Sequence, residues 1–280
     1  MSFSMHPAFH TAKFEDATRR DVVALGHEER MWMIGHMHVD HPAFDRGYGF
    51  VRDLHFPVGQ GIPGKGDMKM LVGNYRSGKS RIVERYAADV ATSCGDCPET
   101  RVLHIVCTSN WTAKTVMVAI VNKLTRLVQS DKPSVELLTR LALEMIARFG
   151  VQLLVVDDIG WVLSKGERAA SSLLTNLRKI QEAGLCSVLL VGSAETHRSI
   201  AKGHAYIGCL RSHGVAGMDW HDGGQHDYML FLDALDDLLP VRAQVRLGHG
   251  PLRPVLLRPV DGLSRVHGPL RPGRRRASPP

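Results

Sequence analysis

The sequence predicts a three-layer α/β fold in which helices cover both faces of a five-stranded parallel sheet. From residue 68 onward, short apolar runs alternate with longer amphipathic stretches, the pattern of β-α units around a parallel sheet. The chain has 280 residues, 44% of them hydrophobic, which suffices for one substantial core with appended segments. The expected strands are 68–72, 102–108, 153–156, 187–191 and 215–220, the last of which is the least apolar.

The segments between these strands are expected to be helices. Each repeats apolar residues at the spacing that lines one helix face, and Gly150 and Gly184 supply stop signals. Residues 21–39 in the N-terminal part are also expected to be helical. The remaining expected helices are 79–89, 112–128, 134–149, 167–182 and 194–200.

Residues 1–67 are interpreted as an N-terminal region and linker, which ends in a connector rich in Pro and Gly at 57–66. The connector contains G-x-G-x-x-G, but this pattern precedes an expected strand instead of following one, so it is rejected as a dinucleotide site. His36, His38 and His41 are spaced neither for one helix face nor for a usual metal site. Solvated or partly buried histidines are therefore expected.

The net charge of +7 is concentrated at the C-terminal end. Residues 241–280 contain nine Arg and one Asp, which leaves the rest close to neutral, so overall charge is no evidence for a nucleic-acid surface on the folded part. No apolar stretch approaches the roughly 20 residues needed to cross a bilayer. Residues 1–13 lack the basic start and apolar core of a secretory signal. A cytoplasmic protein without membrane contact is therefore expected.

The strongest functional signal is a G-x-x-x-x-G-K-S sequence between an expected strand and an expected helix. Gly73 and Gly78 allow backbone N–H groups to surround phosphate oxygens, and the helix start adds the positive end of its dipole. Lys79 supplies a charge to the β and γ phosphates, and the Ser80 hydroxyl is a Mg²⁺ ligand. The predicted ATP-binding residues are Gly73, Asn74, Tyr75, Arg76, Ser77, Gly78, Lys79 and Ser80.

Polar side chains also follow the third and fourth apolar runs. At the carboxyl end of its strand, Asp157 would reach the Mg²⁺ shell and Asp158 would polarise the attacking water. The alternative is that one of these carboxylates merely caps the next segment. Ser193 is a candidate contact to the lytic water or the γ phosphate, and the alternative is an ordinary cap for the helix at 194–200.

Taken together, these motifs resemble the TniB family of transposition ATPases, relatives of TnsC within the AAA+ group. The similarity spans residues 21–240 and includes the P-loop, the segment 153–163, the Val-Gly-Ser at 191–193 and the segment 211–220. The resemblance implies a P-loop NTPase core of the AAA+ type at 68–220, followed by a helical lid.

The resemblance also implies an arginine finger. In that family, an Arg nine residues before a Trp enters the neighbouring subunit's site, and Arg211 stands nine residues before Trp220. The surrounding residues 209–213 depart from the family pattern. AAA+ proteins usually carry Glu where this chain has Asp158, and the shorter side chain predicts slow hydrolysis. The expected catalytic residues are Asp158, Arg211 and Ser193.

The end of the chain departs most from the family. Residues 221–240, with a helix expected from 227 to 239, are interpreted as the remnant of a truncated or replaced lid. The last forty residues hold seven of the 14 Pro and contain His-Gly-Pro-Leu-Arg-Pro twice. Residues 241–280 are therefore expected to form a disordered Arg/Pro-rich tail.

By the resemblance, the protein would assemble on double-stranded DNA as an ATP-bound homo-oligomer, in a ring or filament, and recruit or stimulate a DDE transposase. Its DNA contacts would be to phosphates and independent of sequence. Lys114 is a candidate contact, with a solvated surface Lys as the alternative. Two other functions stay open, namely a helicase-loader-type AAA+ adaptor and a degenerate nucleotide-binding protein that does not hydrolyse.

Overall fold

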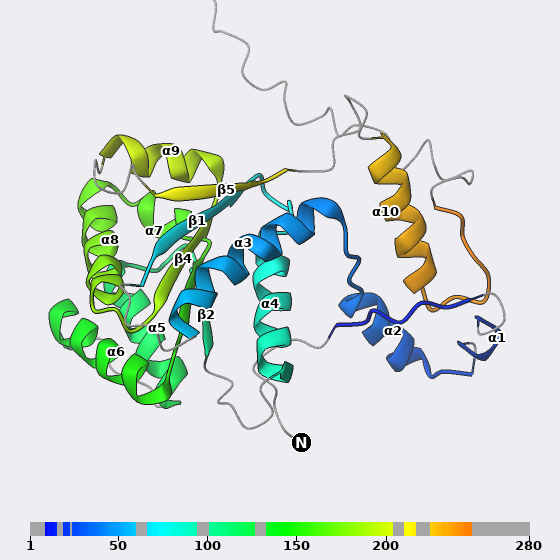
Figure 1. Ribbon diagram of the computed structural model, residues 1–280, viewed down its shortest axis with the longest axis horizontal. Coiled ribbons are helices and arrows are strands. Elements are labelled where there is room, and N and C mark those ends of the chain that lie inside the picture. The colour runs from blue at the N-terminus through cyan, green and yellow to red at the C-terminus, as the bar shows by residue number, and fades with distance from the viewer. Residues whose placement is uncertain are drawn as a thin grey trace, which may run out of the picture.

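Five parallel strands form one sheet between two groups of helices (Figure 1). The computed structural model describes residues 9–15, 19–22, 24–59, 66–93, 101–126, 133–203, 210–216 and 225–247. The strands have the spatial order β2-β3-β4-β1-β5, which confirms the prediction of a five-stranded parallel sheet. Their bounds are β1 Met68–Gly73, β2 Val102–Val106, β3 Leu153–Asp157, β4 Ser187–Gly192 and β5 Arg211–Val215.

The interior strands are apolar because both faces of the sheet are covered. Every residue of β3 and β4 is buried, and β1 is buried except at Lys69 and Gly73, which are half-buried. A parallel sheet with helices on both faces requires such continuous Val and Leu runs. The same runs located these strands in the sequence.

The prediction for the fifth strand is wrong in position. The sequence predicts it at 215–220, but β5 is Arg211–Val215, and residues 217–220 lie outside the described residues. In the described sheet β5 is an edge strand next to β1, and four of its five residues are exposed or half-buried. Because an edge strand needs no continuous apolar run, its polar sequence carries little strand signal.

Two of the helices that cover the sheet, α5 and α6, begin at residues that the capping rules favour. Thr112 Oγ1 accepts the Thr115 N–H at the start of α5, and Ser134 Oγ accepts the Leu137 N–H at the start of α6. Gly150 ends α6 with φ 65°. The helices are α1 Arg19–Val22, α2 His27–His36, α3 Pro42–Gly59, α4 Lys79–Ser93, α5 Ala113–Thr125, α6 Val135–Phe149, α7 Gly160–Leu163, α8 Glu167–Glu182, α9 Ala194–Gly203 and α10 Gln225–Leu238.

Two apolar clusters, one on each face of the sheet, give the fold its three layers. One cluster joins the sheet to α5, α6 and α8 and includes Met70, Ile120 and Leu177. The other joins the sheet to α3 and α4 and includes Leu71 and Val83. Figure 1 shows these two groups of helices on opposite sides of the strands. Met70 and Leu71 belong to different clusters because successive strand residues point to opposite faces.

The N-terminal part differs from its prediction. The expected single helix at 21–39 is replaced by α1 and α2, and α3 extends into the expected Pro/Gly connector at 57–66 as far as Gly59. Val51 and Leu54 of α3 are fully buried in the second cluster. Tertiary packing therefore outweighs the local Pro and Gly signals in α3.

The N-terminal segment and α10 pack together beside the α/β core. The Phe14 N–H donates to the Asp237 carbonyl at 2.8 Å, and the buried Arg19 side chain donates to the Asp236 carbonyl at 3.0 Å. Figure 1 shows α1, α2 and α10 on the same side of the molecule. Segments more than 200 residues apart in the chain thus form one unit.

The described start of the expected tail folds back onto α10. The N–H groups of Val245 and Arg246 both donate to the Asp236 carboxylate at 3.0 Å. Residues 248–280 lie outside the described residues, and their expected disorder stays a prediction. Within the described residues α10 is the one helix after β5. In the same residues, no helix has both the length and the apolar composition that a membrane span requires.

Candidate functional site

The predicted phosphate-binding residues 73–80 run from the last residue of β1, through the turn 74–78, to the first two residues of α4. A Cβ on Gly73 would lie 2.7 Å from the Val215 carbonyl oxygen, so this strand end requires glycine. Gly78 has φ 86° and Arg76 has φ 62°, left-handed conformations that turn successive N–H groups toward one side. The structure therefore places all eight residues at one tight strand-to-helix turn, at the carboxyl end of β1.

The Lys79 ammonium points back into this loop. Nζ donates to the carbonyl oxygens of Gly73 at 3.0 Å and Asn74 at 2.7 Å. Burial lowers the pKa of Lys79, and the carboxylates of Asp157 and Asp158 oppose this effect. A partly desolvated cation surrounded by backbone oxygens can exchange them for phosphate oxygens.

Asp157 ends β3 and is buried among hydrogen-bond donors. Oδ1 accepts the Asp158 N–H at 2.8 Å, Oδ2 lies 3.2 Å from His104 Nε2, and the Ser80 hydroxyl also hydrogen-bonds the carboxylate. Burial raises the pKa of Asp157, but the hydrogen bonds from His104 and Ser80 outweigh it and lower the pKa overall. The carboxylate therefore stays ionised at neutral pH, as a cation ligand must be.

Ser80 and Asp157 are a suitable pair of ligands for Mg²⁺. They bring a hydroxyl and a carboxylate together, and no group of three or more His, Cys, Asp or Glu among the described residues forms a metal site. Mg²⁺ commonly takes one or two protein oxygens and completes its octahedron with phosphate oxygens and water. The donor set therefore fits a cation that arrives with a nucleotide.

Asp158 has an uncommon backbone conformation for a residue with a side chain, with φ 51°. Burial and the neighbouring Asp157 raise the pKa of Asp158, while Lys79 and His104 oppose them. The alternative of a helix cap is not observed, because the N-cap of α7 is Ile159 and has no side-chain cap bond. Asp158 is thus a carboxylate with a raised proton affinity next to the P-loop lysine.

Ser193 caps α9, which is one of the two roles that the sequence allows it. Its Oγ accepts the Thr196 N–H at 3.1 Å and lies 2.9 Å from Thr196 Oγ1. The same residue also lines a cavity of about 210 Å³ next to the P-loop. A hydroxyl can accept and donate at once, so the cap does not prevent a further contact. The cavity is lined by Tyr75, Lys79, Asp158, Gly160, Trp161, Ser164, Gly192, Ser193 and Thr196.

A second cavity, of about 360 Å³, lies at the P-loop and was not predicted from the sequence. Four parts of the chain separated by long sequence intervals form it, so no local motif could have indicated it. Most of the lining side chains are apolar, with Arg76 and Arg81 among them. Its walls are Met37, His38, Val39, His41 and Phe44, then Arg76, Ser77, Gly78, Arg81 and Ile82, then Val215 and Ala216, and finally Phe231 and Leu235 of α10.

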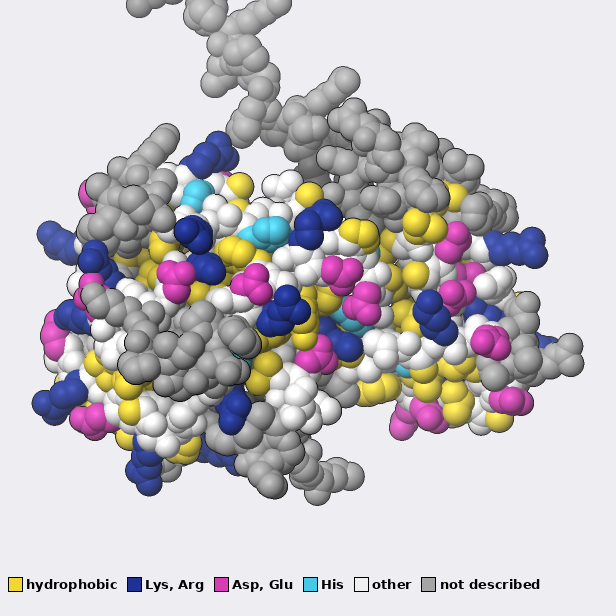
Figure 2. All heavy atoms as spheres, viewed as in Figure 1, with side chains coloured by type: hydrophobic (Ala, Val, Ile, Leu, Met, Phe, Trp, Pro, Cys, Tyr) yellow, Lys and Arg dark blue, Asp and Glu magenta, His cyan; other side chains and the backbone are white. Residues whose placement is uncertain are grey.

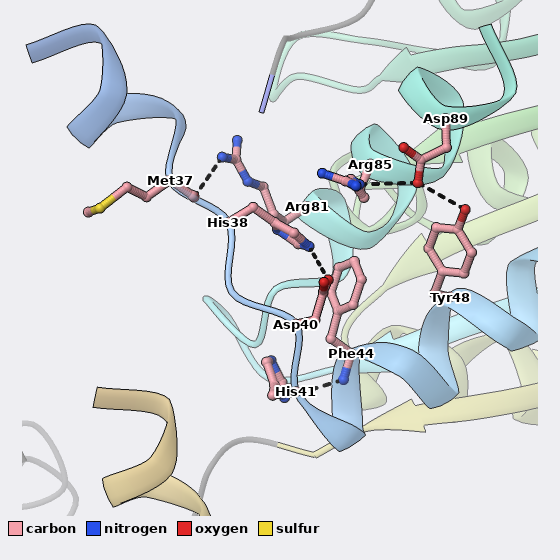
Figure 3. A network of polar contacts seen from close by, with 9 residues as sticks. All are labelled: Met37, His38, Asp40, His41, Phe44, Tyr48, Arg81, Arg85 and Asp89. Carbon is pink, nitrogen blue, oxygen red and sulfur yellow. Dashed lines mark hydrogen bonds and ion pairs between the residues drawn. The ribbon is translucent and has the colours of Figure 1, made fainter. Parts of the chain in front are cut away.

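Polar contacts attach the N-terminal wall of this cavity to α4 (Figure 3). Arg81 Nη2 donates to the Met37 carbonyl at 3.0 Å, and its guanidinium lies 4.3 Å from the centre of the Phe9 ring. His38 Nε2 lies 3.0 Å from Asp40 Oδ1. Burial lowers the pKa of His38 and that of His41, although nearby Asp residues oppose it. Partly buried histidines were expected here, but not their place beside the P-loop.

Arg211 is placed far from the P-loop of its own chain. It begins β5, where it pairs with Lys69 at the start of β1, whereas Val215 pairs with Gly73 at the P-loop end. Four residues of strand correspond to about 13 Å. The Arg211 side chain is exposed. Within the described chain this residue is therefore not brought to the other site residues.

On the face in Figure 2, the described residues form no patch of one sign of charge. Lys114 lies in the first turn of α5 and is half-buried. On the face in Figure 2, Lys and Arg side chains alternate with Asp and Glu over the described residues. The near-neutral balance that the sequence gives for residues 1–240 thus appears as mixed charge on this face.

Comparisons with solved structures identify the fold. The chain is 13% identical to Aeropyrum pernix ORC2 in ADPNP-ADP complexes, with a TM-score of 0.54, over 69% of this chain and 51% of that chain. It is 16% identical to Aeropyrum pernix ORC1 in complex with DNA, with a TM-score of 0.52, over 70% and 50%. The chain thus spans about half the length of these structures, and at such identities the likeness concerns the fold alone.

The comparison with family models is more specific. No curated protein sequence matches the chain. The model of the bacterial TniB protein matches residues 61–205, which include the P-loop, Asp157, Asp158 and Ser193. This match covers just over half of the 280 residues. With the sheet order and the P-loop geometry described above, the chain belongs to the TniB family and has the fold of a P-loop AAA+ ATPase.

Proposed function

We propose that the protein binds and hydrolyses ATP with Mg²⁺ and acts as an ATP-dependent DNA-binding regulator of transposition. The meeting of Lys79, Ser80, Asp157 and Asp158 at one end of the sheet carries this proposal. They supply a cation, a hydroxyl, an ionised carboxylate and a carboxylate of raised pKa. These groups lie next to the P-loop turn, in which Arg76 and Gly78 have left-handed conformations. Phosphoryl transfer from a nucleotide needs these groups.

The roles follow from the contacts. Lys79 would exchange its backbone carbonyl partners for the β and γ phosphates. Ser80 and Asp157 would hold Mg²⁺, which would neutralise charge on those phosphates. Asp158 faces the 210 Å³ cavity and orients the attacking water there. Ser193 lines the same cavity and contacts that water or the γ phosphate while it caps α9.

The 360 Å³ cavity is the proposed site for the base and ribose. Its lining combines P-loop residues 76–78 with apolar side chains from residues 37–44 and from α10. A flat purine is held largely by such apolar contact, with a few polar groups for orientation. A nucleotide there would contact α10 and residues 37–44 as well as the P-loop.

Arg211 acts in a neighbouring subunit under this proposal. It is exposed and lies at the end of β5 away from its own P-loop, so stabilisation of the transferring phosphoryl group requires a second copy of the chain. A homo-oligomeric ring or filament would provide that copy. We also propose that the chain divides after residues 67, 220 and 240 into the N-terminal region, the ATPase core, the lid remnant and the tail.

The proposed partners are double-stranded DNA, bound independently of sequence, and a DDE transposase. Family membership supports transposition, and an ORC1 protein of the same fold has been solved in complex with DNA. A cytoplasmic location fits these partners. A non-hydrolysing nucleotide-binding protein is the second candidate, because Asp158 is short for a residue that must reach a water.

The test is ATP turnover measured without DNA, with duplex DNA and with single-stranded DNA, using Lys79→Ala as the inactive control. Stimulation by duplex of any sequence supports the transposition function. A preference for single strands would instead favour a helicase-loader-type adaptor. Binding of ATP without turnover under all three conditions would favour the non-hydrolysing protein.

A further inference from the structure

A histidine on the neighbouring strand contacts the proposed Mg²⁺ ligand. His104 belongs to β2, an otherwise apolar strand, and its side chain is 11% exposed. Its Nε2 atom lies 3.2 Å from Oδ2 of Asp157, whose side chain is 1% exposed. The two residues are 53 positions apart in the chain. Their meeting depends on the pairing of β2 with β3.

The direction of this hydrogen bond follows from the chemistry of the two groups. An ionised carboxylate can only accept, so the imidazole must carry its proton on Nε2 and donate it. The Asp158 N–H donates to the other oxygen at 2.8 Å, and Ser80 hydrogen-bonds the same carboxylate. The carboxylate is therefore fixed from three directions, and His104 provides the only imidazole among these donors.

The backbone around this contact is fixed as well. Lys123 Nζ of α5 donates to the His104 carbonyl at 2.6 Å, and the Cys107 N–H donates to the Asp157 carbonyl at 2.9 Å. In the β2-β3 ladder, His104 pairs with Val155 and Val106 pairs with Asp157. The backbones of His104 and Asp157 are thus held next to each other on neighbouring strands.

We propose that His104 is a positioning residue that holds the Asp157 carboxylate in the orientation in which it binds the nucleotide's divalent cation together with Ser80. The inference depends on the proposed nucleotide site, and His104 itself touches neither nucleotide nor metal. Residues that orient a metal ligand commonly alter metal affinity by about 10- to 100-fold when removed. Loss of His104 should therefore weaken cation binding and leave the phosphate contacts of the P-loop unchanged.

The test measures Mn²⁺, as a spectroscopic substitute for Mg²⁺, by electron paramagnetic resonance in the presence of a non-hydrolysable ATP analogue. His104→Leu should weaken Mn²⁺ binding about 10-fold or more. His104→Gln, whose amide N–H can reach the place of Nε2, should recover most of the affinity. Binding of the analogue in EDTA should be the same in both variants and the parent.

A buried histidine elsewhere supplies the matched control. His55 is 7% exposed and contacts Tyr86 Oη at 2.6 Å and Gln152 Oε1 at 2.8 Å. His55→Leu should lower the melting temperature without changing Mn²⁺ affinity. Parent-like Mn²⁺ affinity in His104→Leu would overturn the positioning role. Failure of the parent to bind Mn²⁺ with the analogue would overturn the proposed nucleotide site itself.

A measurement on the unmodified protein avoids any folding defect of the variants. Imidazole ¹⁵N chemical shifts show which ring nitrogen of His104 carries a proton, and donation to the Asp157 carboxylate requires a proton on Nε2. A proton on Nδ1 alone would leave no donor toward Asp157 and would contradict the inference.

Discussion

Replacement of Lys79 by Ala should weaken nucleotide binding and leave the fold intact. Lys79 is buried, but it belongs to neither apolar cluster, and its ammonium contacts the backbone oxygens of Gly73 and Asn74. Removal of a partly desolvated cation has a small net effect on stability, because its desolvation cost disappears with its hydrogen bonds. The free protein should therefore melt close to the parent temperature.

The magnitude follows from the exchange of partners at Nζ. In the free protein Nζ already donates to Gly73 and Asn74, so phosphate oxygens replace existing hydrogen bonds. A hydrogen bond to a charged group contributes about 1.5–3 kcal/mol. We therefore expect a net loss of about 2–3 kcal/mol, equivalent to an affinity ~30- to ~150-fold weaker.

Calorimetric titration with a non-hydrolysable analogue measures this loss, and thermal melts provide an independent value. A ligand at 100 times its Kd stabilises the folded state by about 2.7 kcal/mol, whereas a 100-fold weaker ligand at that concentration adds only about 0.4 kcal/mol. Lys69→Ala, which removes a charge at the other end of β1, is the matched control and should keep the parent affinity. A folded Lys79→Ala protein with parent affinity would refute the site.

Three further predictions concern catalysis, assembly and the tail. Asp158→Asn should bind ATP normally and lower turnover. Burial and Asp157 raise the pKa of Asp158, and the base must be ionised. Turnover by the parent should therefore rise with pH through a value above the ordinary Asp range. Parent-like turnover in Asp158→Asn would remove its role as base. Arg211→Ala should lower turnover in assemblies. If the arginine acts across the interface, mixing Arg211→Ala subunits with Lys79→Ala subunits should restore part of the activity. No recovery of activity would argue against action in trans. Removal of residues 248–280 should abolish weak DNA binding that is salt-sensitive and independent of ATP, measured by anisotropy at two salt concentrations, and should leave ATP-dependent binding in place.

The sequence determined the parts of the protein whose signals are local. The P-loop lies within eight residues between a strand and a helix, and Asp157 directly follows a buried apolar run, so chain order and strand direction suffice to place them at one end of a sheet. The same holds for α8, whose bounds match the prediction because an apolar stripe repeats along it.

Signals failed where tertiary contacts decide the structure. β5 lies at the edge of the sheet, where exposure permits a polar sequence. α3 extends into the Pro/Gly connector because Val51 and Leu54 pack against the sheet. Periodicity reports only how a segment divides between core and solvent, so it does not detect a strand such as β5, of which one residue is buried.

The surroundings of the site belong to the tertiary structure alone. The larger cavity needs residues 37–44, the P-loop, the end of β5 and α10 together, and His104 meets Asp157 only because β2 pairs with β3. Sequence spacing carries no information on contacts between distant segments, since these arise from the spatial order of the strands in the sheet. The sequence by itself therefore determined which chemical groups the site has, and the packing of the sheet determined what holds them in place.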